Sequence, residues 1–180
     1  AHEGVGARVT LDRTLRDGDV IDLPGRHPRR LRALETPGHS RAHLVFHEET
    51  SRTVIAGDLV SGLGTVVIDP PYGNLRDYLA SLERLRALNL LTLIPGHGAP
   101  HRGVGRLIEA LVEHRRMREG RVLHALAEGP LPLEELRVRV YSDTPDADPR
   151  LAARMLVAHL EKLEAEGKAR VEGGVARLQS

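Results

Sequence analysis

The chain contains no cysteine and no tryptophan, and aromatic residues make up only 2% of its 180 residues. Without cysteine there can be no disulfide bond and no thiolate metal ligand, so histidine and carboxylate side chains are the only strong metal ligands available. Because aromatic residues are scarce, a hydrophobic core has to be built from Leu, Val, Ile and Ala. The hydrophobic content of 41% is sufficient for a globular protein with such a core.

The sequence also lacks an apolar run long enough to span a membrane, a secretory signal pattern and an excess of charge of either sign. Its 26 Lys and Arg residues are balanced by 25 Asp and Glu residues, which gives a formal net charge of +1. Such a balance does not predict binding to a polyanion through the overall electrostatic field. We therefore expect a cytoplasmic protein without a membrane partner.

The first third of the chain predicts short β-strands separated by turns. The expected strands are residues 7–11, 20–23, 31–35, 42–47 and 53–55. Between them, residues 26–32 carry four arginines and one histidine. We interpret this segment as a loop, either a solvated turn, which is the more common case, or a surface that faces phosphate.

The middle of the chain alternates between loop, helix and strand. Residues 61–73 predict a long loop of the kind that carries functional residues on a strand scaffold. Residues 75–88 place five leucines on one stripe, which predicts an amphipathic helix that covers a sheet. Residues 91–94 predict another buried strand, and the order strand, helix, strand indicates an α/β architecture.

The C-terminal part predicts three helices followed by a hairpin. The helices are expected at residues 104–126, 133–140 and 151–163, and strands at 168–171 and 175–178 flank the turn Gly173-Gly174. Three helices followed by a two-stranded wing are typical of a winged-helix domain. The expected division is an α/β core at residues 1–102 and a helical, winged-helix-like domain at residues 103–180.

Three residues suited to metal binding follow predicted strands in the same way. His39, Asp58 and His97 each come directly after a glycine that ends an apolar run. Taken singly, a turn histidine or a capping aspartate is the more common explanation, but the repetition favours metal ligands. Because neighbouring strands of one sheet end close together, the three side chains are expected at one rim, where imidazole nitrogen and carboxylate oxygen would bind zinc. His43 and His47 are interpreted as hydrogen-bonded or surface residues.

At these residues the chain resembles the metallo-β-lactamase superfamily, in particular its lactamase-like, endoribonuclease-type hydrolases with a C-terminal winged helix. The matching motifs are Thr36-Pro37-Gly38-His39, Ala56-Gly57-Asp58, Ile94-Pro95-Gly96-His97-Gly98, Glu113-His114-Arg115 with Arg118-Glu119, and His159-Leu160-Glu161-Lys162-Leu163-Glu164 with Glu166-Gly167-Lys168. The resemblance implies the C-terminal part of an αββα sandwich.

The same resemblance implies a hydrolase with two zinc ions, in which His39 binds the first ion, His97 binds the second, and Asp58 bridges both and acts as the catalytic residue. The implied substrate is a phosphodiester of single-stranded RNA. A small-molecule thioester or lactone is the alternative, because fold-level similarity does not choose among substrates.

One motif of this family is absent. The signature H-x-H-x-D-H, which supplies most of the metal ligands, does not occur in the sequence, and His2 and His27 do not reproduce it. The chain is therefore either the C-terminal portion of a longer hydrolase or a degenerate member without catalysis. We expect the first, with the N-terminal half of the same protein as the partner that completes the site, and we expect the 180-residue chain by itself to be inactive.

A different class of function is a non-catalytic module that binds nucleic acid or regulates through its winged helix. Residues 115–180 contain 12 Lys and Arg residues and 11 Asp and Glu residues, a difference of +1. Binding to nucleic acid normally requires a clustered basic face, which this balance does not indicate. We expect the domain to pack beside the active site or to mediate a homodimer.

Overall fold

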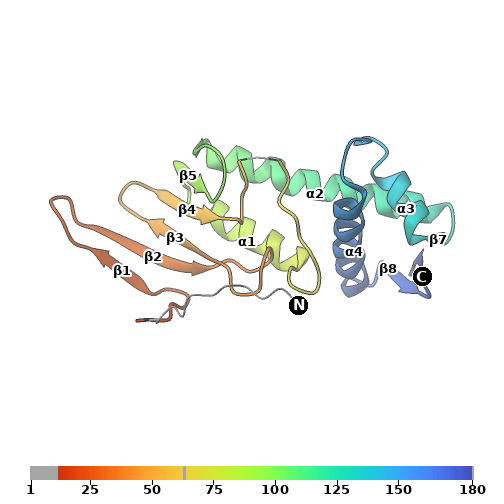
Figure 1. Ribbon diagram of the computed structural model, residues 1–180, viewed down its shortest axis with the longest axis horizontal. Helices are drawn as coiled ribbons and strands as arrows, with labels where there is room; N and C mark the ends of the chain where they lie inside the picture. The colour runs from red at the N-terminus through yellow and green to blue at the C-terminus, as the bar shows by residue number, and fades with distance from the viewer. Residues whose placement is uncertain (1–11, 63, 180) are drawn as a thin grey trace, which may run out of the picture.

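The computed structural model describes residues 12–62 and 64–179. Within these ranges the chain forms a six-stranded sheet, helices packed against it and a C-terminal helical unit with a three-stranded sheet (Figure 1). The strand predicted at residues 7–11 lies outside the described residues. In the part that is described, no helix has the length and apolar character needed to cross a membrane.

The strands of the large sheet follow one another in chain order. They are β1 (Val20–Leu23), β2 (Arg29–Glu35), β3 (Leu44–Glu48), β4 (Thr53–Gly57), β5 (Thr92–Pro95) and β6 (His101–Arg102). Each neighbouring pair is antiparallel except β4 and β5, which are parallel and are joined through helix α1 (Leu75–Ala87). As a result β2, β4 and β5 run in the same direction, and all three end at one edge of the sheet.

The expectation of a loop over residues 26–32 is wrong for its second half, because Arg29 begins strand β2. The exposed arginines of this strand are matched by acidic side chains on the neighbouring strands. Arg30 Nε lies 3.0 Å from Asp22 Oδ1 of β1, and Arg29 Nη1 lies 3.6 Å from Glu48 Oε2 of β3. Cross-strand pairs of opposite charge make a charged strand compatible with a sheet, although the run of arginines resembles a loop.

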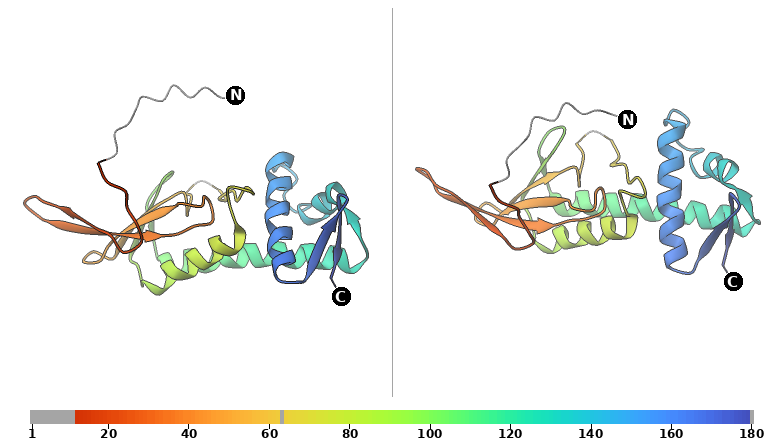
Figure 2. Two further views of the ribbon diagram at one scale, coloured as in Figure 1. Left: turned by 90° about the horizontal axis from the view of Figure 1, so that it is seen from below. Right: turned by 60° about the horizontal axis from the view of Figure 1, so that its bottom comes forward.

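Helices α1 and α2 (Val104–Ala127) lie on the same face of the sheet (Figure 2). Helix α1 begins where the side chain of Asn74 accepts a hydrogen bond from the amide of Asp77 at 3.0 Å, which satisfies an otherwise unpaired donor. The leucine stripe predicted for this segment is confirmed: Leu75, Leu82 and Leu85 are buried against the sheet. The core is mainly aliphatic, as expected from the shortage of aromatic residues.

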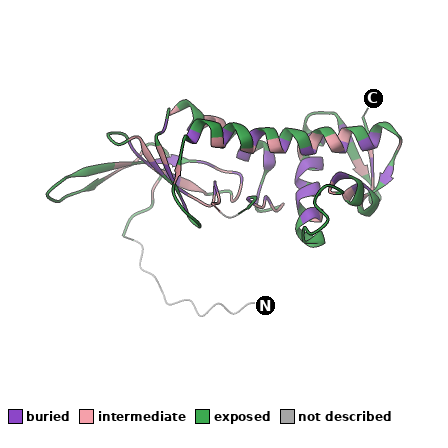
Figure 3. Ribbon diagram, turned by 90° about the horizontal axis from the view of Figure 1, so that it is seen from above, coloured by how far each residue is buried: buried purple, intermediate pink, exposed green. Residues whose placement is uncertain are grey.

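Helix α2 belongs to two hydrophobic cores. Near its start, Ile108 and Val112 pack in the core under the large sheet, whereas Val122 and Leu126 pack in the core of the C-terminal unit. Its outward face is exposed along most of its length (Figure 3). A division of the chain at residues 102 and 103 stays a prediction, since this helix contributes to both parts.

The C-terminal unit has the three helices and the hairpin that the sequence predicts. Besides the second half of α2, its elements are β7 (Leu131–Pro132), α3 (Leu133–Val140), α4 (Pro149–Ala165), β8 (Ala169–Glu172) and β9 (Val175–Leu178). Gly173 and Gly174 form the turn of the hairpin with φ angles of 58° and 79°, values that favour glycine. Strand β7 adds a third strand to β9, which the sequence pattern did not predict.

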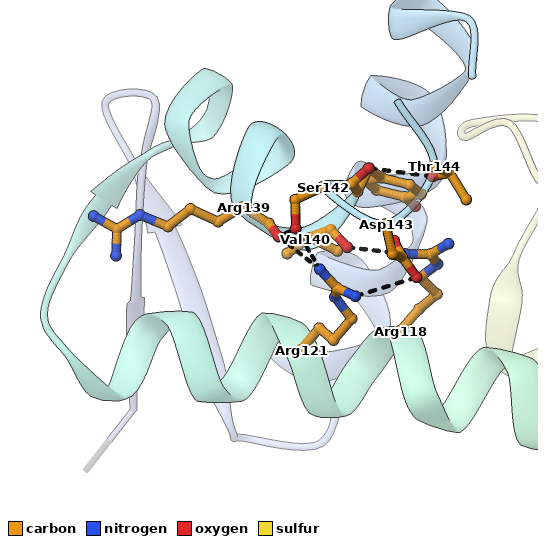
Figure 4. A network of polar contacts seen from close by, with 8 residues as sticks. Arg118, Arg121, Arg139, Val140, Ser142, Asp143 and Thr144 are labelled. Atoms are coloured by element: carbon orange, nitrogen blue, oxygen red, sulfur yellow. Dashed lines mark hydrogen bonds and ion pairs between the residues drawn. The ribbon is translucent and has the colours of Figure 1, made fainter. Parts of the chain in front are cut away.

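Two arginines of α2, of which Arg118 is buried, fasten this helix to the C-terminal end of α3 and to the segment that follows it (Figure 4). Arg118 is 4% exposed, donates to Val140 O at 2.9 Å and pairs with Asp143 Oδ1 at 2.5 Å. Arg121 Nη1 lies 3.1 Å from Asp143 Oδ2, and its Nη2 donates to Ser142 Oγ at 2.7 Å. These contacts fix the angle between α2 and α3.

A buried histidine on α4 predicts a pH dependence of stability. His159 is 0% exposed, and its Nδ1 lies 3.8 Å from Glu119 Oε1. Burial lowers the pKa of His159 below its ordinary value of 6.5, although Glu119 opposes this effect. The unfolded chain therefore binds a proton at a higher pH than the folded chain does, so the free energy of unfolding falls as the pH falls below 6.5.

We expect the free energy of unfolding, measured by urea denaturation between about pH 7.5 and about pH 5.5, to decline by up to ~1.4 kcal/mol per pH unit for this group. His159→Gln should make the decline less steep, because about one proton fewer is taken up on unfolding. His124→Gln, at an exposed position of α2, is the control for the substitution itself. Equal slopes for the wild type and His159→Gln would contradict the prediction.

Candidate metal centre

The loops after β4 and β5 pack glycine against glycine, and this packing brings Asp58 and His97 together. The amide of Gly96 donates to Gly57 O at 2.8 Å, and the amide of Gly62 donates to His97 O at 2.9 Å. A Cβ atom at Gly96 would lie 2.7 Å from Asp58 Oδ1, so a larger residue would displace the carboxylate. Asp58 Oδ1 and His97 Nε2 are 3.5 Å apart, and the side chains are 49% and 71% exposed.

The loop that carries His39 is pressed against the start of α1. Gly38 has a φ angle of 138°, and a Cβ atom there would lie 2.3 Å from Tyr78 Cα. The amide of Asn74 donates to Gly38 O at 2.7 Å, and Ser81 Oγ donates to Pro37 O at 2.7 Å. Only glycine fits this approach of two backbones, which fixes where His39 leaves the loop.

The imidazole of His39 is oriented by a backbone carbonyl. Its Nδ1 lies 2.9 Å from Val67 O. Because a carbonyl oxygen can only accept a hydrogen bond, Nδ1 carries the proton and donates it. In the neutral ring, the lone pair of Nε2 is then free to bind a metal ion, which is the usual arrangement for a histidine ligand.

The structure places a further histidine at this rim, which sequence reasoning treated as a hydrogen-bonded or surface residue. His43 is hydrogen-bonded, since its Nδ1 lies 2.9 Å from Thr36 Oγ1. Its ring is perpendicular to that of His39 at 6.5 Å between centroids, and its Nε2 would lie 3.0 Å from a Cβ atom at Gly57. Burial lowers the pKa of His43, and neighbouring His39 adds to the effect, while Asp58 opposes it.

The signal that could have identified His43 was its position four residues after His39 in the same loop. Other histidines lie elsewhere. His47 is buried in β3 with its Nε2 unpaired, and His101 is in β6. Tyr78 is fully buried under the Gly38 loop, whereas Tyr72 is 73% exposed.

The rim thus brings Asp58 to His97 and His39 to His43. Across residues 12–62 and 64–179, no group of three or more His, Asp or Glu side chains is arranged to hold a metal ion. The donor types nevertheless fit zinc, since imidazole nitrogen and carboxylate oxygen are both zinc ligands. The exposure of Asp58 and His97 leaves room beside them for donors from another segment. The residues fit part of a coordination shell.

Comparison with known families agrees with this arrangement. Residues 6–97 match the sequence model of the family described as the metallo-beta-lactamase superfamily. Residues 133–177 match the model described as the beta-lactamase associated winged helix domain. The two matches cover the rim with its three candidate ligands and the unit formed by α3, α4 and the wing.

The chain is similar to "Probable metallo-hydrolase YqjP" of Bacillus subtilis (strain 168), with 31% identity over 166 residues, which are 87% of this chain and 50% of that protein. It is 32% identical over 110 residues, 61% of this chain and 33% of that protein, to an "Atrochrysone carboxyl ACP thioesterase" of Aspergillus fumigatus.

The crystal structure of the metallo-beta-lactamase family protein TTHA1429 from Thermus thermophilus superposes with a TM-score of 0.78 at 30% identity, covering 92% of this chain and 54% of that chain. The chain spans about half the length of the curated relatives that it matches over most of its own length. On the family match and the shared fold, the chain belongs to the metallo-beta-lactamase superfamily and carries that superfamily's associated winged helix domain.

Proposed function

We propose that this chain is the C-terminal portion of a metal-dependent hydrolase, with zinc as the metal and His39, Asp58 and His97 as ligands to two ions, Asp58 bridging them. The observation that carries the proposal is the pairing of Asp58 and His97, 3.5 Å apart at the end of two parallel strands. The free Nε2 of His39, in the loop that follows a third strand, β2, ending at the same edge, supports it. Zinc bound there would supply Lewis acidity and an activated water nucleophile.

The chain's own residues prepare this site without a metal. Val67 O holds the ring of His39 in one tautomer, so no reorientation is needed on binding. Gly96 leaves space for the Asp58 carboxylate at the strand ends, and Gly57 leaves space for the imidazole of His43. The exposure of Asp58 and His97 gives a substrate access to the rim from solvent.

The uncovered face of the sheet is evidence for a partner segment that completes the coordination shell of the metal. Phe46, Ile55 and Ile94 are cross-strand neighbours in register on β3, β4 and β5. Val54 and Leu93, on the alternate face, are fully buried under the helices, so Ile55 and Ile94, at 41% and 37% exposed, face away from them. An apolar row on a sheet favours burial against another layer. We propose that the N-terminal half of the same protein covers it and supplies the missing ligands.

Two substrate classes remain for the hydrolase. The charges of the winged helix disfavour the phosphodiester of single-stranded RNA, since residues 133–177 contain 8 Lys and Arg residues and 9 Asp and Glu residues. Most of these basic side chains are already paired, as in Arg139 with Glu128 at 2.6 Å and Lys162 with Glu166 at 2.6 Å. An acyl thioester is therefore the substrate class we favour, supported by the similarity to a thioesterase.

The same pairing weakens the alternative of a non-catalytic module that binds nucleic acid. A filter-binding assay with single-stranded RNA over a salt series separates the two functions. We expect no binding above background at physiological salt. A tight complex whose affinity falls steeply with salt would support the nucleic-acid module instead.

We expect the 180-residue chain to bind zinc weakly and to hydrolyse nothing above background, because its three candidate ligands leave each ion without a complete shell. Co-expression with the N-terminal half should give about two tightly bound zinc ions per chain and hydrolytic activity. The measurements are metal analysis after exhaustive dialysis, thiol release from an acyl-coenzyme A, and cleavage of a fluorogenic single-stranded RNA.

His97→Ala is the test variant for this experiment, and His124→Ala, at an exposed position of helix α2, is the matched control. The first should lose zinc from the restored protein, and the second should retain it. Stoichiometric tight zinc and turnover in the 180-residue chain alone would show that the missing-ligand argument is wrong. Cleavage of RNA without thiol release would reverse the choice of substrate.

A further inference from the structure

The carbonyl that orients His39 lies in a short segment that is held from the C-terminal side of the molecule. This segment, residues 66–69, has no strand or helix of its own. Val66 O accepts a hydrogen bond from Arg115 Nη2 of α2 at 2.6 Å. One residue further on, Val67 O lies 2.9 Å from Nδ1 of His39. A single peptide unit therefore separates the guanidinium of Arg115 from the carbonyl that fixes the candidate ligand.

Helix α4 of the winged-helix domain holds the other half of the same segment. The amide of Ile68 donates to Met155 Sδ at 3.1 Å, and Asp69 Oδ2 pairs with Arg154 Nη1 at 2.9 Å. Met155 is 6% exposed and belongs to the core under the large sheet. Every residue of the segment 66–69 thus has a polar contact with α2, with α4 or with His39.

Arg115 also acts on the other side of His39. Its side chain is 2% exposed, and its guanidinium carbon lies 5.3 Å from the centre of the Tyr78 ring, within cation–π range. Tyr78 is the residue whose backbone packs against Gly38, directly before His39. The same buried cation therefore braces both the loop from which His39 projects and the segment to which its ring is bonded.

We propose that Arg115, Arg154 and Met155 are positioning residues for His39, so that the winged-helix domain acts as a clamp on the metal centre. This inference rests on the proposed function in one respect only, that His39 is a metal ligand. The orientation of the His39 ring does not depend on it. If these three side chains were removed, residues 66–69 would still be held at their C-terminal end by the turn that follows. In this turn Asp69 O accepts a hydrogen bond from the amide of Gly73 at 2.8 Å. That turn does not reach Val67, so the imidazole loses a fixed acceptor for Nδ1.

Helix α2 offers a close control for Arg115. Arg118 is likewise buried, donates to a backbone carbonyl, Val140 O, at 2.9 Å, and has its guanidinium carbon 4.7 Å from the centre of the Tyr141 ring. Its contacts lie at the C-terminal end of α3 and in the segment after it, and none that the structure shows is with residues 66–69 (Figure 4). Arg115→Met and Arg118→Met each remove a buried guanidinium that bonds a backbone carbonyl and lies over a tyrosine ring, and Arg118→Met removes the ion pair with Asp143 as well.

The experiment compares these variants in the full 180-residue chain at constant pH. Long-range 1H–15N correlation spectra of the imidazole, assigned with His39→Gln, report the tautomer of His39 in the absence of metal. In the wild type and in Arg118→Met we expect the proton on Nδ1 alone. In Arg115→Met we expect a mixture of both tautomers, together with a zinc affinity lower by ~10-fold or more.

A second pair protects the test against misfolding of the buried variants. Arg154 is an exposed residue of α4, and Arg154→Ala should give a smaller shift in the same direction, whereas Arg150→Ala on the same helix should give none. An unchanged His39 tautomer in both Arg115→Met and Arg154→Ala would overturn the proposal. So would an equal change in Arg118→Met. If the tautomer shifts but no variant, including the wild type, binds zinc, the clamp stands and the proposed function fails.

Discussion

Asp58→Ala should abolish hydrolysis in the protein with its N-terminal half restored. Asp58 is the carboxylate that we propose as the bridge between two metal ions, and no other described carboxylate lies within ion-pair distance of His97. Removing a hydrogen-bond partner of a ligand typically costs 10–100-fold in activity or metal affinity, so the loss of a bridging ligand should exceed ~100-fold. The measurements are kcat/KM for the acyl thioester and zinc content after dialysis.

The fold should tolerate this change, because the side chain of Asp58 is 49% exposed. We expect a change of ~0.5 kcal/mol or less in the free energy of unfolding. Asp22→Ala removes an aspartate that pairs with Arg30 far from the rim, and it should keep full activity. An Asp58→Ala protein with wild-type turnover would rule out the bridging role.

Gly38→Ala should damage both the fold and the candidate site. The added methyl group would lie 2.3 Å from Tyr78 Cα and 2.4 Å from Tyr78 N, and both are backbone atoms that cannot rotate away. The φ angle of 138° adds strain for any residue with a side chain. Together, overpacking and backbone strain should lower the free energy of unfolding by ~3 kcal/mol or more, measured by urea denaturation.

Gly120→Ala is the matched control for Gly38→Ala. Gly120 lies inside α2, and a Cβ atom there would meet no other atom within 4 Å. Because glycine disfavours a helix interior, this substitution should raise the free energy of unfolding by ~1 kcal/mol. Should Gly38→Ala be as stable as the wild type, the close approach of the His39 loop to α1 would not be needed for folding.

Local signals in the sequence were sufficient to predict most elements of this fold. The leucine stripe predicted at residues 75–88 is helix α1, and the hairpin around Gly173 and Gly174 is formed by β8 and β9. These predictions succeed because helical periodicity and turn geometry are properties of neighbouring residues. The prediction of a loop for the arginine-rich segment was wrong for a non-local reason. The acidic side chains that pair with the arginines of strand Arg29–Glu35 lie on β1 and β3.

The sequence also identified His39, Asp58 and His97 as candidates, because each follows a glycine at the end of an apolar run. That all three lie at one edge required the order and direction of the strands. For His43 the sequence offered only its position four residues after His39, whereas its proximity to this edge depends on the packing of its loop against Gly57.

By itself, the sequence determined the type of most elements and the chemistry of the rim, because both are set by residues close together in the chain. Only the tertiary structure decided how the rim is supported. Arg115 appears in the sequence as one charge in a polar helix, yet packing buries it between Val66 and Tyr78. Met155 reaches the same segment from the winged-helix domain. Such support is decided by contacts between residues far apart in the chain, which no local pattern encodes.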